Sequence, residues 1–461
     1  MRTEILDKHM TQEHFPSPDL FDPPSPSEML TARRVALAIL QRIFDKHHTI
    51  DQVFDDSKEF SSLSQRDRAF VRMLVTTVIR RLGQIDDLIR RALSKPDQPL
   101  NPPVLGYILR LGVAQLIFMN IPDHAAVNTS VLLAEVEGHI RMKGFVNAIL
   151  RRIAAEGKDW ESKQDIPRLN TPEWLLKNWI QDYGLRTALE IAMSNLQEAA
   201  LDVTLKDEAQ REHWAQTLGG EALPTGGVRL THARMITELP GFEDGMWWVQ
   251  DAAASLPAQL FGTNIAGASV LDLCAAPGGK TAQLASMGAN VVALDRSAKR
   301  IQRLQSNMKR MRLGHSVRTE IADAAVWRSR EQFPYILLDA PCSATGTIRR
   351  NPDVLWMKSE GDLNSLVDLQ ARLLENALSM LQPGGVLVYC TCSLQKCEGE
   401  NQIDRLIERR DDVDRIPIQA SEVGEIRDFI TPRGDVRILP TYLPEIGGID
   451  GFYIARLGKA L

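Results

Sequence analysis

The feature that most constrains this 461-residue chain is a regular alternation of apolar strands and helices after Ala252. Short apolar runs predict strands at residues 270–274, 290–295, 335–340 and 384–392. Helical patterns separate these strands at residues 281–288, 297–312 and 365–381. Such alternation predicts a parallel, doubly wound α/β sheet, which binds ligands at the carboxyl ends of its strands. A glycine turn and a final strand, within residues 447–461, complete the domain.

A loop of small residues follows the first predicted strand and opens the next helix. It comprises Cys274, Ala275, Ala276, Pro277, Gly278, Gly279 and Lys280. Its two glycines let the backbone approach a ligand closely, and the helix N-terminus supplies free N–H groups. Asp295 ends the second strand, 17 residues after Gly278, where a carboxylate can accept hydrogen bonds from both hydroxyls of a ribose. The G-x-G-x-x-G spacing of NAD sites is missing, so loop and acid predict another adenosine-type cofactor, with a tight glycine turn beside a surface acid as the alternative.

Two cysteines lie just past the ends of two predicted strands. Cys342 belongs to the run at 339–343, and Cys392 belongs to the run at 391–393. Because the parallel strands of such a sheet end at one edge, both thiols can face one pocket. Cys274 and Cys390 are expected within strands, where small buried thiols are common in protein cores. The sequence therefore predicts Cys342 and Cys392 as the thiols that face a ligand.

The five cysteines carry two further implications. Cys390, Cys392 and Cys397 lie close together, but the nine histidines lie elsewhere and the C-x-x-C spacing of zinc sites is absent, so we expect no metal. The odd count also argues against a disulfide scaffold and favours a reducing, cytoplasmic location. No run of about 18 apolar residues predicts a membrane span, and the first residues lack the apolar stretch of a signal peptide.

The patterns divide the chain into four segments. Residues 1–27 hold five prolines among polar residues and are predicted to be a disordered arm. Residues 28–157 repeat apolar positions at helical spacing and predict an all-α domain. Residues 158–250 mix helices with short strands as a small α+β linker, and residues 251–461 form the α/β domain. The expected helix N-caps include Thr31 and Thr171.

Charge is distributed unevenly along the chain. The whole sequence carries a formal charge of −5, which by itself argues against nucleic acid. Residues 28–157, however, carry 18 basic and 14 acidic side chains, whereas residues 158–461 carry 34 and 40. A basic domain in an acidic chain can dock on phosphates, since local potential matters more than total charge. A solvated helical surface explains the same charges, so both interpretations stay open.

Longer motifs are more specific. The runs VLDLCAAPGGKT, VVALD, LLDAPCSATGT, RRNPDVLW and VYCTCSL, between residues 270 and 394, resemble those of the RNA cytosine-carbon-5 methyltransferases. Flanking segments that contain Gln250, Asp251 and Asp450 match as well. The segments RRVALAILQRI, LGYILRLGVAQLIFM and GFVNAILRRI resemble the NusB family of small helical RNA-binding domains. A NusB-like domain before such a catalytic domain resembles the bacterial 16S ribosomal RNA methyltransferases.

The resemblance implies a Rossmann-like catalytic domain with S-adenosylmethionine as methyl donor. The cofactor is then expected against residues 274–280 and Asp295. Asp323, after the third strand, is expected at the adenine edge, and Asp339 is expected to border the methionine end. The ammonium of Lys280, which opens the helix after the loop, is expected to steady a carboxylate in the pocket, with a solvated lysine as the alternative.

Two thiols suit this chemistry. Carbon-5 of cytosine is a weak nucleophile, and a thiolate that adds at carbon-6 activates it. The resemblance assigns Cys392 as the attacking thiol and Cys342 as the group that helps release the product. DNA cytosine methyltransferases instead attack with the Pro-Cys thiol, so chemistry alone does not set the two roles. Asp339 is expected to hydrogen-bond the cytosine edge and favour its protonated form.

The expected partner is RNA, with 16S ribosomal RNA in naked or early-assembly form as the implied substrate, bound by a monomeric protein. Six arginines are candidate phosphate contacts: Arg33, Arg34, Arg151, Arg152, Arg349 and Arg350. Two other functions stay open, a transfer RNA methyltransferase and an RNA-binding assembly factor with a decayed catalytic domain. Family members that act on transfer RNA generally lack the NusB-like domain, and intact Cys342 and Cys392 argue against decay. The run at 398–401 is looser than the family pattern and is not expected to touch the chemistry.

Overall fold

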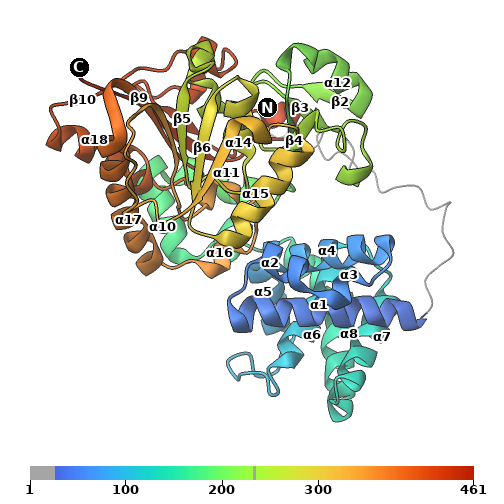
Figure 1. Ribbon diagram of the computed structural model, residues 1–461. Helices are drawn as coiled ribbons and strands as arrows, with labels where there is room; N and C mark the ends of the chain where they lie inside the picture. The colour runs from blue at the N-terminus through green and yellow to red at the C-terminus, as the bar shows by residue number, and fades with distance from the viewer. Residues whose placement is uncertain (1–25, 232–234) are drawn as a thin grey trace, which may run out of the picture.

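The computed structural model describes residues 26–231 and 235–461 (Figure 1). Figure 1 shows a helical domain, coloured blue to cyan, beside a larger domain built around a sheet. A smaller region with short strands, green in Figure 1, lies at one side of the larger domain. The predicted arm lies outside the described residues, except for its last two positions, which begin the first helix. Within the described ranges, no helix is both long and apolar enough to cross a lipid bilayer.

The first domain is all-α, as its sequence predicts. Its helices are α1 (Pro26–Lys46), α2 (Ile50–Asp56), α3 (Lys58–Ser61), α4 (Gln65–Arg80), α5 (Leu82–Ala92), α6 (Val104–Val113), α7 (Asp123–Val136) and α8 (Lys143–Glu161). Apolar residues that recur at helical spacing, such as Leu40, Val75 and Ile108, are fully buried in one shared core. The domain therefore owes its fold to apolar helix faces that pack on one another.

Two expected helix caps are wrong. α1 begins at Pro26, so Thr31 lies inside the helix. Proline suits the first helical turn because its fixed φ is already helical and its missing N–H would have no partner there. α10 (Glu173–Tyr183) has Pro172 as its cap residue, so the side chain of Thr171 does not cap it. In both places a proline, rather than the nearby threonine, sets the start of the helix.

The middle region contains helices and a small sheet. Its elements are α9 (Ile166–Leu169), α10, α11 (Leu185–Ser194), β1 (Leu201–Leu205), α12 (Arg211–Leu218), β2 (Gly220–Ala222), β3 (Val228–Leu230) and β4 (Trp247–Val249). The strands pair antiparallel in the order β2-β3-β1-β4. Trp179 of α10 and Ile191 of α11 pack with Ile348 and Leu394 of the larger domain. These two helices therefore share a core with the segments that follow the two cysteine motifs.

The larger domain alternates strands and helices. Its elements are α13 (Ala252–Gln259), β5 (Ser269–Leu273), α14 (Gly279–Ser286), β6 (Asn290–Asp295), α15 (Ala298–Arg310), β7 (Val317–Ile321), β8 (Phe333–Asp339), α16 (Val354–Met357), α17 (Glu360–Met380), β9 (Leu381–Thr391), α18 (Glu400–Arg409), β10 (Val413–Arg415), β11 (Val436–Ile438) and β12 (Phe452–Lys459). The main sheet has the strand order β10-β12-β9-β8-β5-β6-β7, and β11 pairs with β12.

The prediction of a parallel sheet holds for only part of this sheet. β7, β6, β5, β8 and β9 are parallel neighbours, whereas β12 pairs antiparallel with β9. Helix α18 separates β9 from β10, so β10 runs in the same direction as β9. β12 then returns between these two strands and pairs antiparallel with both. The five parallel strands end at one edge, which carries the predicted site residues.

The helical domain contacts the segment RRNPDVLW through hydrogen bonds. The backbone N–H of Ile50 donates to Asp353 Oδ2 (3.0 Å), and Trp356 Nε1 donates to the carbonyl of Ile79 (2.9 Å). Arg80 Nη2 donates to the carbonyl of Arg349 (2.9 Å). This motif therefore joins the NusB-like domain to the region after Cys342.

Candidate active site

The chain leaves β5 through the loop that was expected to bind a cofactor. Cys274 is the first residue past the strand, with φ 62°, so the expectation that it lies within a strand is wrong. Gly278 has φ 102°, a conformation that favours glycine. A Cβ atom on Gly278 would also lie 2.8 Å from Leu304 Cγ, so glycine lets the loop pack against α15. α14 then begins at Gly279, and its first turn has N–H groups without helical partners.

Asp295 lies at the end of β6, directly beside this loop. Its Oδ2 accepts a hydrogen bond from the backbone N–H of Ala276 (3.3 Å), and its Oδ1 accepts one from Ser297 (2.9 Å). Arg300 Nη1 forms an ion pair with Oδ2 at 3.2 Å. The predicted position of Asp295 beside the loop is confirmed. Each carboxylate oxygen can accept more than one hydrogen bond, so Asp295 can still accept hydrogen bonds from a ribose. The ribose contact itself stays a prediction.

Asp339 and Lys280 form an ion pair at the centre of the site. Lys280 Nζ, from the first turn of α14, donates to Asp339 Oδ2 at the end of β8 (2.7 Å). Burial lowers the pKa of Lys280, but the carboxylate of Asp339 outweighs it, and the net shift is upward. The ammonium therefore stays charged, and the expectation that Lys280 steadies a carboxylate is confirmed.

A further carboxylate, Asp272 of β5, was not among the predicted site residues. Thr281 Oγ1 donates to its Oδ2 (2.6 Å), and its Oδ1 is buried without a hydrogen-bond partner among the described residues. Burial raises the pKa of Asp272 to about 7, and the carboxylate of Asp339 adds to the shift. An acid in the middle of the apolar run VLDL was the signal that the sequence offered.

The structure brings the two predicted thiols, Cys342 and Cys392, into contact. Cys342 Sγ and Cys392 Sγ lie 3.5 Å apart, and either sulfur can donate the hydrogen bond. The hydrogen bond with Cys392, followed by burial, raises the pKa of Cys342 well above its usual value. Cys390 lies buried in β9 as expected, with its Sγ 3.4 Å from Asp339 Oδ1. In the described part of the chain, no group of three or more His, Cys, Asp or Glu side chains is arranged to hold a metal ion.

One buried acid, Glu398, holds the two cysteine loops to each other. Its Oε1 accepts hydrogen bonds from the backbone N–H of Ser343 and from Gln370 Nε2, both at 2.9 Å. Its Oε2 accepts hydrogen bonds from the hydroxyls of Ser343 and Ser393, both at 2.5 Å. Ser343 follows Cys342, and Ser393 follows Cys392, so a single carboxylate fixes both loops. Glu398, the first residue of the run at 398–401, therefore positions the loops that carry both thiols; that this run does not touch the reacting atoms stays a prediction.

Asp323 lies two residues past the end of β7, next to the strand that ends at Asp295. The side chain is exposed, and its Oδ1 accepts a hydrogen bond from the backbone N–H of Ala325 (2.9 Å). Both predicted cofactor acids thus follow neighbouring strands at the same edge. The adenine contact of Asp323 stays a prediction.

Arg349 is buried and is not a phosphate contact, which corrects the sequence interpretation, whereas Arg350 is half-buried and paired with carboxylates. Arg349 is 3% exposed and donates to the carbonyl of Gly447 at 2.5 Å. Arg350 forms ion pairs with Asp251 (2.5 Å) and Asp450 (2.8 Å). Buried charges need such partners, so both arginines hold the cysteine segment against the segments before α13 and β12.

The four candidate arginines of the helical domain differ in their exposure to solvent. Arg33 is 4% exposed, and its Nε donates to Gln115 Oε1 (2.7 Å) in the core. Burial lowers its pKa to about 10. The expected phosphate contact of Arg33 is therefore wrong, whereas Arg34, Arg151 and Arg152 are exposed.

The residues at this edge fit S-adenosylmethionine. The orphaned Asp272 Oδ1 is an acceptor for an ammonium group, and the free N–H groups of α14 suit a carboxylate. Asp295 and Asp323 are acceptors for hydroxyl and amino groups. The donor and acceptor set therefore matches the methionine and adenosine ends of that cofactor.

Fold and site together define a Rossmann-like methyltransferase domain that follows a NusB domain. Two family models match in agreement with this: 16S rRNA methyltransferase RsmB/F over residues 264–458, and the NusB family over residues 30–155. The ribosomal RNA small subunit methyltransferase B of Xanthomonas campestris is 34% identical over 94% of this chain and 98% of its own length. That of Cronobacter sakazakii is 31% identical over 93% and 99%. The chain belongs to the ribosomal RNA small subunit methyltransferase B family.

Solved structures resemble the fold. The protein PH0851 superposes with a TM-score of 0.73 over 95% of this chain and 100% of its own, at 24% identity. NSun6 from Pyrococcus horikoshii, solved with SFG, has a TM-score of 0.53 over 63% of this chain and 98% of its own, at 19% identity. At these identities the likeness concerns the fold, and it agrees with the predicted fold class.

Proposed function

We propose that this chain transfers a methyl group from S-adenosylmethionine to carbon-5 of a cytosine in 16S ribosomal RNA, in naked or early-assembly form. The observation that carries the proposal is the 3.5 Å separation of the Cys342 and Cys392 sulfurs, beside the Asp339–Lys280 ion pair. Family membership supports the substrate, since the matching model is described as a 16S rRNA methyltransferase. A monomer is the proposed working form.

S-adenosylmethionine supplies the methyl group when bound. Residues 274–280 and Asp272 would hold its methionine end, with Asp339 as the neighbouring acid. Asp295 would accept hydrogen bonds from the ribose, and Asp323 would take the adenine edge. The ion pair with Lys280 holds the carboxylate of Asp339 in place, so the acid is in position when the base arrives.

Cys392 is the attacking thiol in this proposal. Its thiolate forms a bond to carbon-6 of the cytosine, and the ring electrons shift to carbon-5, which becomes nucleophilic. Carbon-5 takes the methyl group and then gives its proton to a water molecule, which acts as the base. The electrons of that C–H bond restore the ring double bond, the S–C6 bond breaks, and Cys392 leaves as a thiolate.

Cys342 and Asp339 assist this attack and release. The raised pKa of Cys342 keeps its proton in place while the neighbouring sulfur reacts. Cys342 can then exchange a proton with the departing sulfur at hydrogen-bond distance. Asp339 accepts a hydrogen bond from the protonated cytosine edge, which makes carbon-6 more electrophilic.

The target cytosine has to leave its stack to reach such a pocket. RNA loops make this step inexpensive because their bases are already partly unstacked. The NusB domain would help to hold the RNA, with its exposed arginines as the contacts. Naked RNA gives access to loops that a finished ribosomal subunit covers.

The proposal is tested by incubating the full chain with methyl-labelled S-adenosylmethionine and a transcript of 16S ribosomal RNA. Digestion to nucleosides and mass spectrometry should give labelled 5-methylcytidine at one position. A transfer RNA transcript is the matched control and should stay unlabelled. Labelled transfer RNA would favour the transfer RNA alternative, and a different methylated nucleoside would overturn the proposed chemistry.

A further inference from the structure

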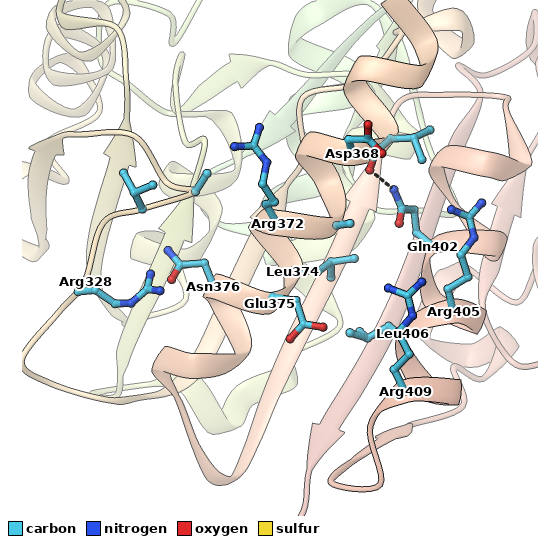
Figure 2. Close-up of a pocket in the computed structure, with 14 residues that line it drawn as sticks. Arg328, Asp368, Arg372, Leu374, Glu375, Asn376, Gln402, Arg405, Leu406 and Arg409 are labelled. Atoms are coloured by element: carbon cyan, nitrogen blue, oxygen red, sulfur yellow. Dashed lines mark hydrogen bonds between the residues drawn. The ribbon is translucent and has the colours of Figure 1, made fainter.

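A groove outside the active site is lined by arginines. It lies between α17, α18 and the loop after β7, and has a volume of about 460 Å³ (Figure 2). Four guanidinium groups line it, from Arg328, Arg372, Arg405 and Arg409. We infer that this groove binds the sugar–phosphate backbone of the substrate RNA, next to the nucleotide that enters the active site. The inference rests on the proposed function for the identity of the RNA.

The four arginines are exposed, and carboxylates do not neutralise them. Within residues 26–231 and 235–461, no carboxylate oxygen lies within 4 Å of any of their guanidinium nitrogens. The groove contains two acids, and one of them, Glu375, is already paired with Arg410 at 2.9 Å. Only Asp368 offsets the four positive charges. A surface with this imbalance attracts a polyanion.

Arginine is the side chain best suited to phosphate, because its planar fork donates two parallel hydrogen bonds. Arg405 and Arg409 are one helical turn apart on α18, about 6 Å along the helix axis. Arg372 faces the groove from α17, and Arg328 lies across it in Figure 2. Four positive charges from three segments that line one groove suit a chain of phosphates better than a single small anion.

The groove adjoins the cysteine loops through two glutamines. Gln402, which lines the groove, donates through Nε2 to Gln370 Oε1 (3.3 Å). Gln370 in turn donates to the carbonyl of Pro341 (2.9 Å), the residue before Cys342. On the other side, Arg328 follows the predicted cofactor residue Asp323 by five positions. An RNA strand that delivers a base to the thiols therefore has a cationic surface close by for its neighbouring phosphates.

The test compares two triple variants of the full chain. The groove variant is Arg372→Gln, Arg405→Gln and Arg409→Gln, and the control variant is Lys163→Gln, Arg168→Gln and Arg186→Gln. Both remove three positive charges, and the control residues are exposed and lie far along the chain from the groove. Binding of a 16S ribosomal RNA transcript is measured by filter retention from about 50 to 200 mM salt.

In the groove variant, the slope of the logarithm of the RNA binding constant against the logarithm of the salt concentration should be smaller in magnitude by about 2. Each lost phosphate contact removes roughly 0.7–0.9 from this slope. Its affinity should fall at least about tenfold at the lowest salt, and the control variant should match the wild type. The corresponding triple lysine variant should keep most of the slope because it keeps the charge. Affinity for S-adenosylmethionine, measured by calorimetry, should be the same in all proteins and reports that they are folded.

If the groove and control variants have equal slopes of RNA binding against salt, the inference is overturned. An acidic protein would then be the next candidate for the ligand of this groove. A failure of the proposed function has a different result, in which wild-type protein binds the transcript with a normal slope but forms no 5-methylcytidine. If the lysine variant loses as much slope as the glutamine variant, charge is not the cause, and the inference is also wrong.

Discussion

The helical domain and the carboxyl edge of the large sheet bury different kinds of side chain. The helical core consists of apolar residues, with a few polar ones that are hydrogen-bonded. The sheet edge instead buries several charged groups close together: Asp272, Lys280, Asp295 and Glu398. Burying charge costs free energy unless partners and hydrogen bonds offset the cost.

The buried polar groups of the two regions therefore have different roles: those of the helical domain support packing, and those of the sheet edge lie near reactive groups. In the helical domain, the buried Arg33–Gln115 pair satisfies polar atoms and brings no reactive group with it. At the sheet edge, the buried charges lie near two thiols and an oxygen, Asp272 Oδ1, that has no hydrogen-bond partner in the described part of the chain. Perturbed groups of this kind gather at functional sites, so substitutions at the sheet edge should change the chemistry, whereas substitutions in the helical core should change stability alone.

The largest effect is expected for the two thiols. Cys392→Ala should lower methyl transfer at least about a thousandfold and form no covalent adduct, because it removes the nucleophile. Cys342→Ala should still attack but release product poorly, and should accumulate a protein–RNA complex that survives denaturing electrophoresis. A trapped complex in Cys392→Ala alone would reverse the roles. Full activity of both variants would contradict covalent catalysis.

The second effect concerns pH. The pKa of Asp272 is raised to about 7 in the folded chain, so between about pH 4 and pH 7 the unfolded chain loses a proton that the folded chain keeps. Asp272 thus lowers the free energy of unfolding as pH rises through this window, by on the order of 4 kcal/mol.

Asp272→Asn cannot titrate and serves as the reference for this effect. Urea unfolding of both proteins at several pH values should show wild-type stability falling relative to Asp272→Asn between about pH 4 and pH 7. Other titrating groups cancel in this comparison. A difference that does not vary with pH would show that Asp272 is ionised throughout.

Glu398 should matter next, as a positioning residue. Glu398→Gln replaces one acceptor oxygen by an NH₂ group that faces hydroxyl or N–H donors, so the two cysteine loops lose their shared anchor. Methylation should fall about a hundredfold, since small misplacements of reacting groups have costs of that size. In a Cys342→Ala background, the adduct should form correspondingly more slowly.

Glu408→Gln, at an exposed site on α18, is the matched control. It should change neither the rate of methylation nor the rate of adduct formation. Affinity for S-adenosylmethionine should stay the same in both glutamine variants. An adduct rate in Glu398→Gln equal to that of the control would limit Glu398 to a structural role.

A smaller effect is expected for Asp295. Asp295→Ala removes a charged acceptor of ribose hydrogen bonds, which should reduce the affinity for S-adenosylmethionine by about 1.5–3 kcal/mol, or roughly tenfold or more. Calorimetric titration measures this directly. Unchanged affinity would rule out the ribose contact.

The smallest effect lies in the helical domain and affects stability alone. Arg33→Ala removes the donor to the buried Gln115 Oε1 and should lower stability by about 1–2 kcal/mol. Arg34→Ala, at an exposed site, should change stability by less than about 0.5 kcal/mol. The slope of RNA binding against salt should be unaffected in Arg33→Ala. A smaller slope there would mean that Arg33 reaches phosphate after all.

Much of the fold and part of the site follow from local sequence. Apolar spacing predicted the helices and most strands, and positions past the strand ends predicted that Cys342 and Cys392 would meet. Glu398 was missed because its contacts with Ser343 span 55 positions, and no local pattern encodes them. The contact between Lys280 and Asp339 spans 59 positions, yet it was expected because both residues lie at predicted ends of elements.

The sequence alone determined the helical domain, the alternating strands, the glycine loop and the two thiols, because periodicity, turn chemistry and motif spacing are local properties. Only the tertiary structure decided which charged residues are buried. Arg349 and Arg350 look like surface arginines in sequence, but contacts with the segment before β12, about a hundred positions away, bury Arg349 and hold Arg350 half-buried. The arginines of α17 and α18 stay exposed because the opposite faces of both helices pack on the sheet. Burial depends on which distant segments pack together, and that is fixed only when the whole chain has folded.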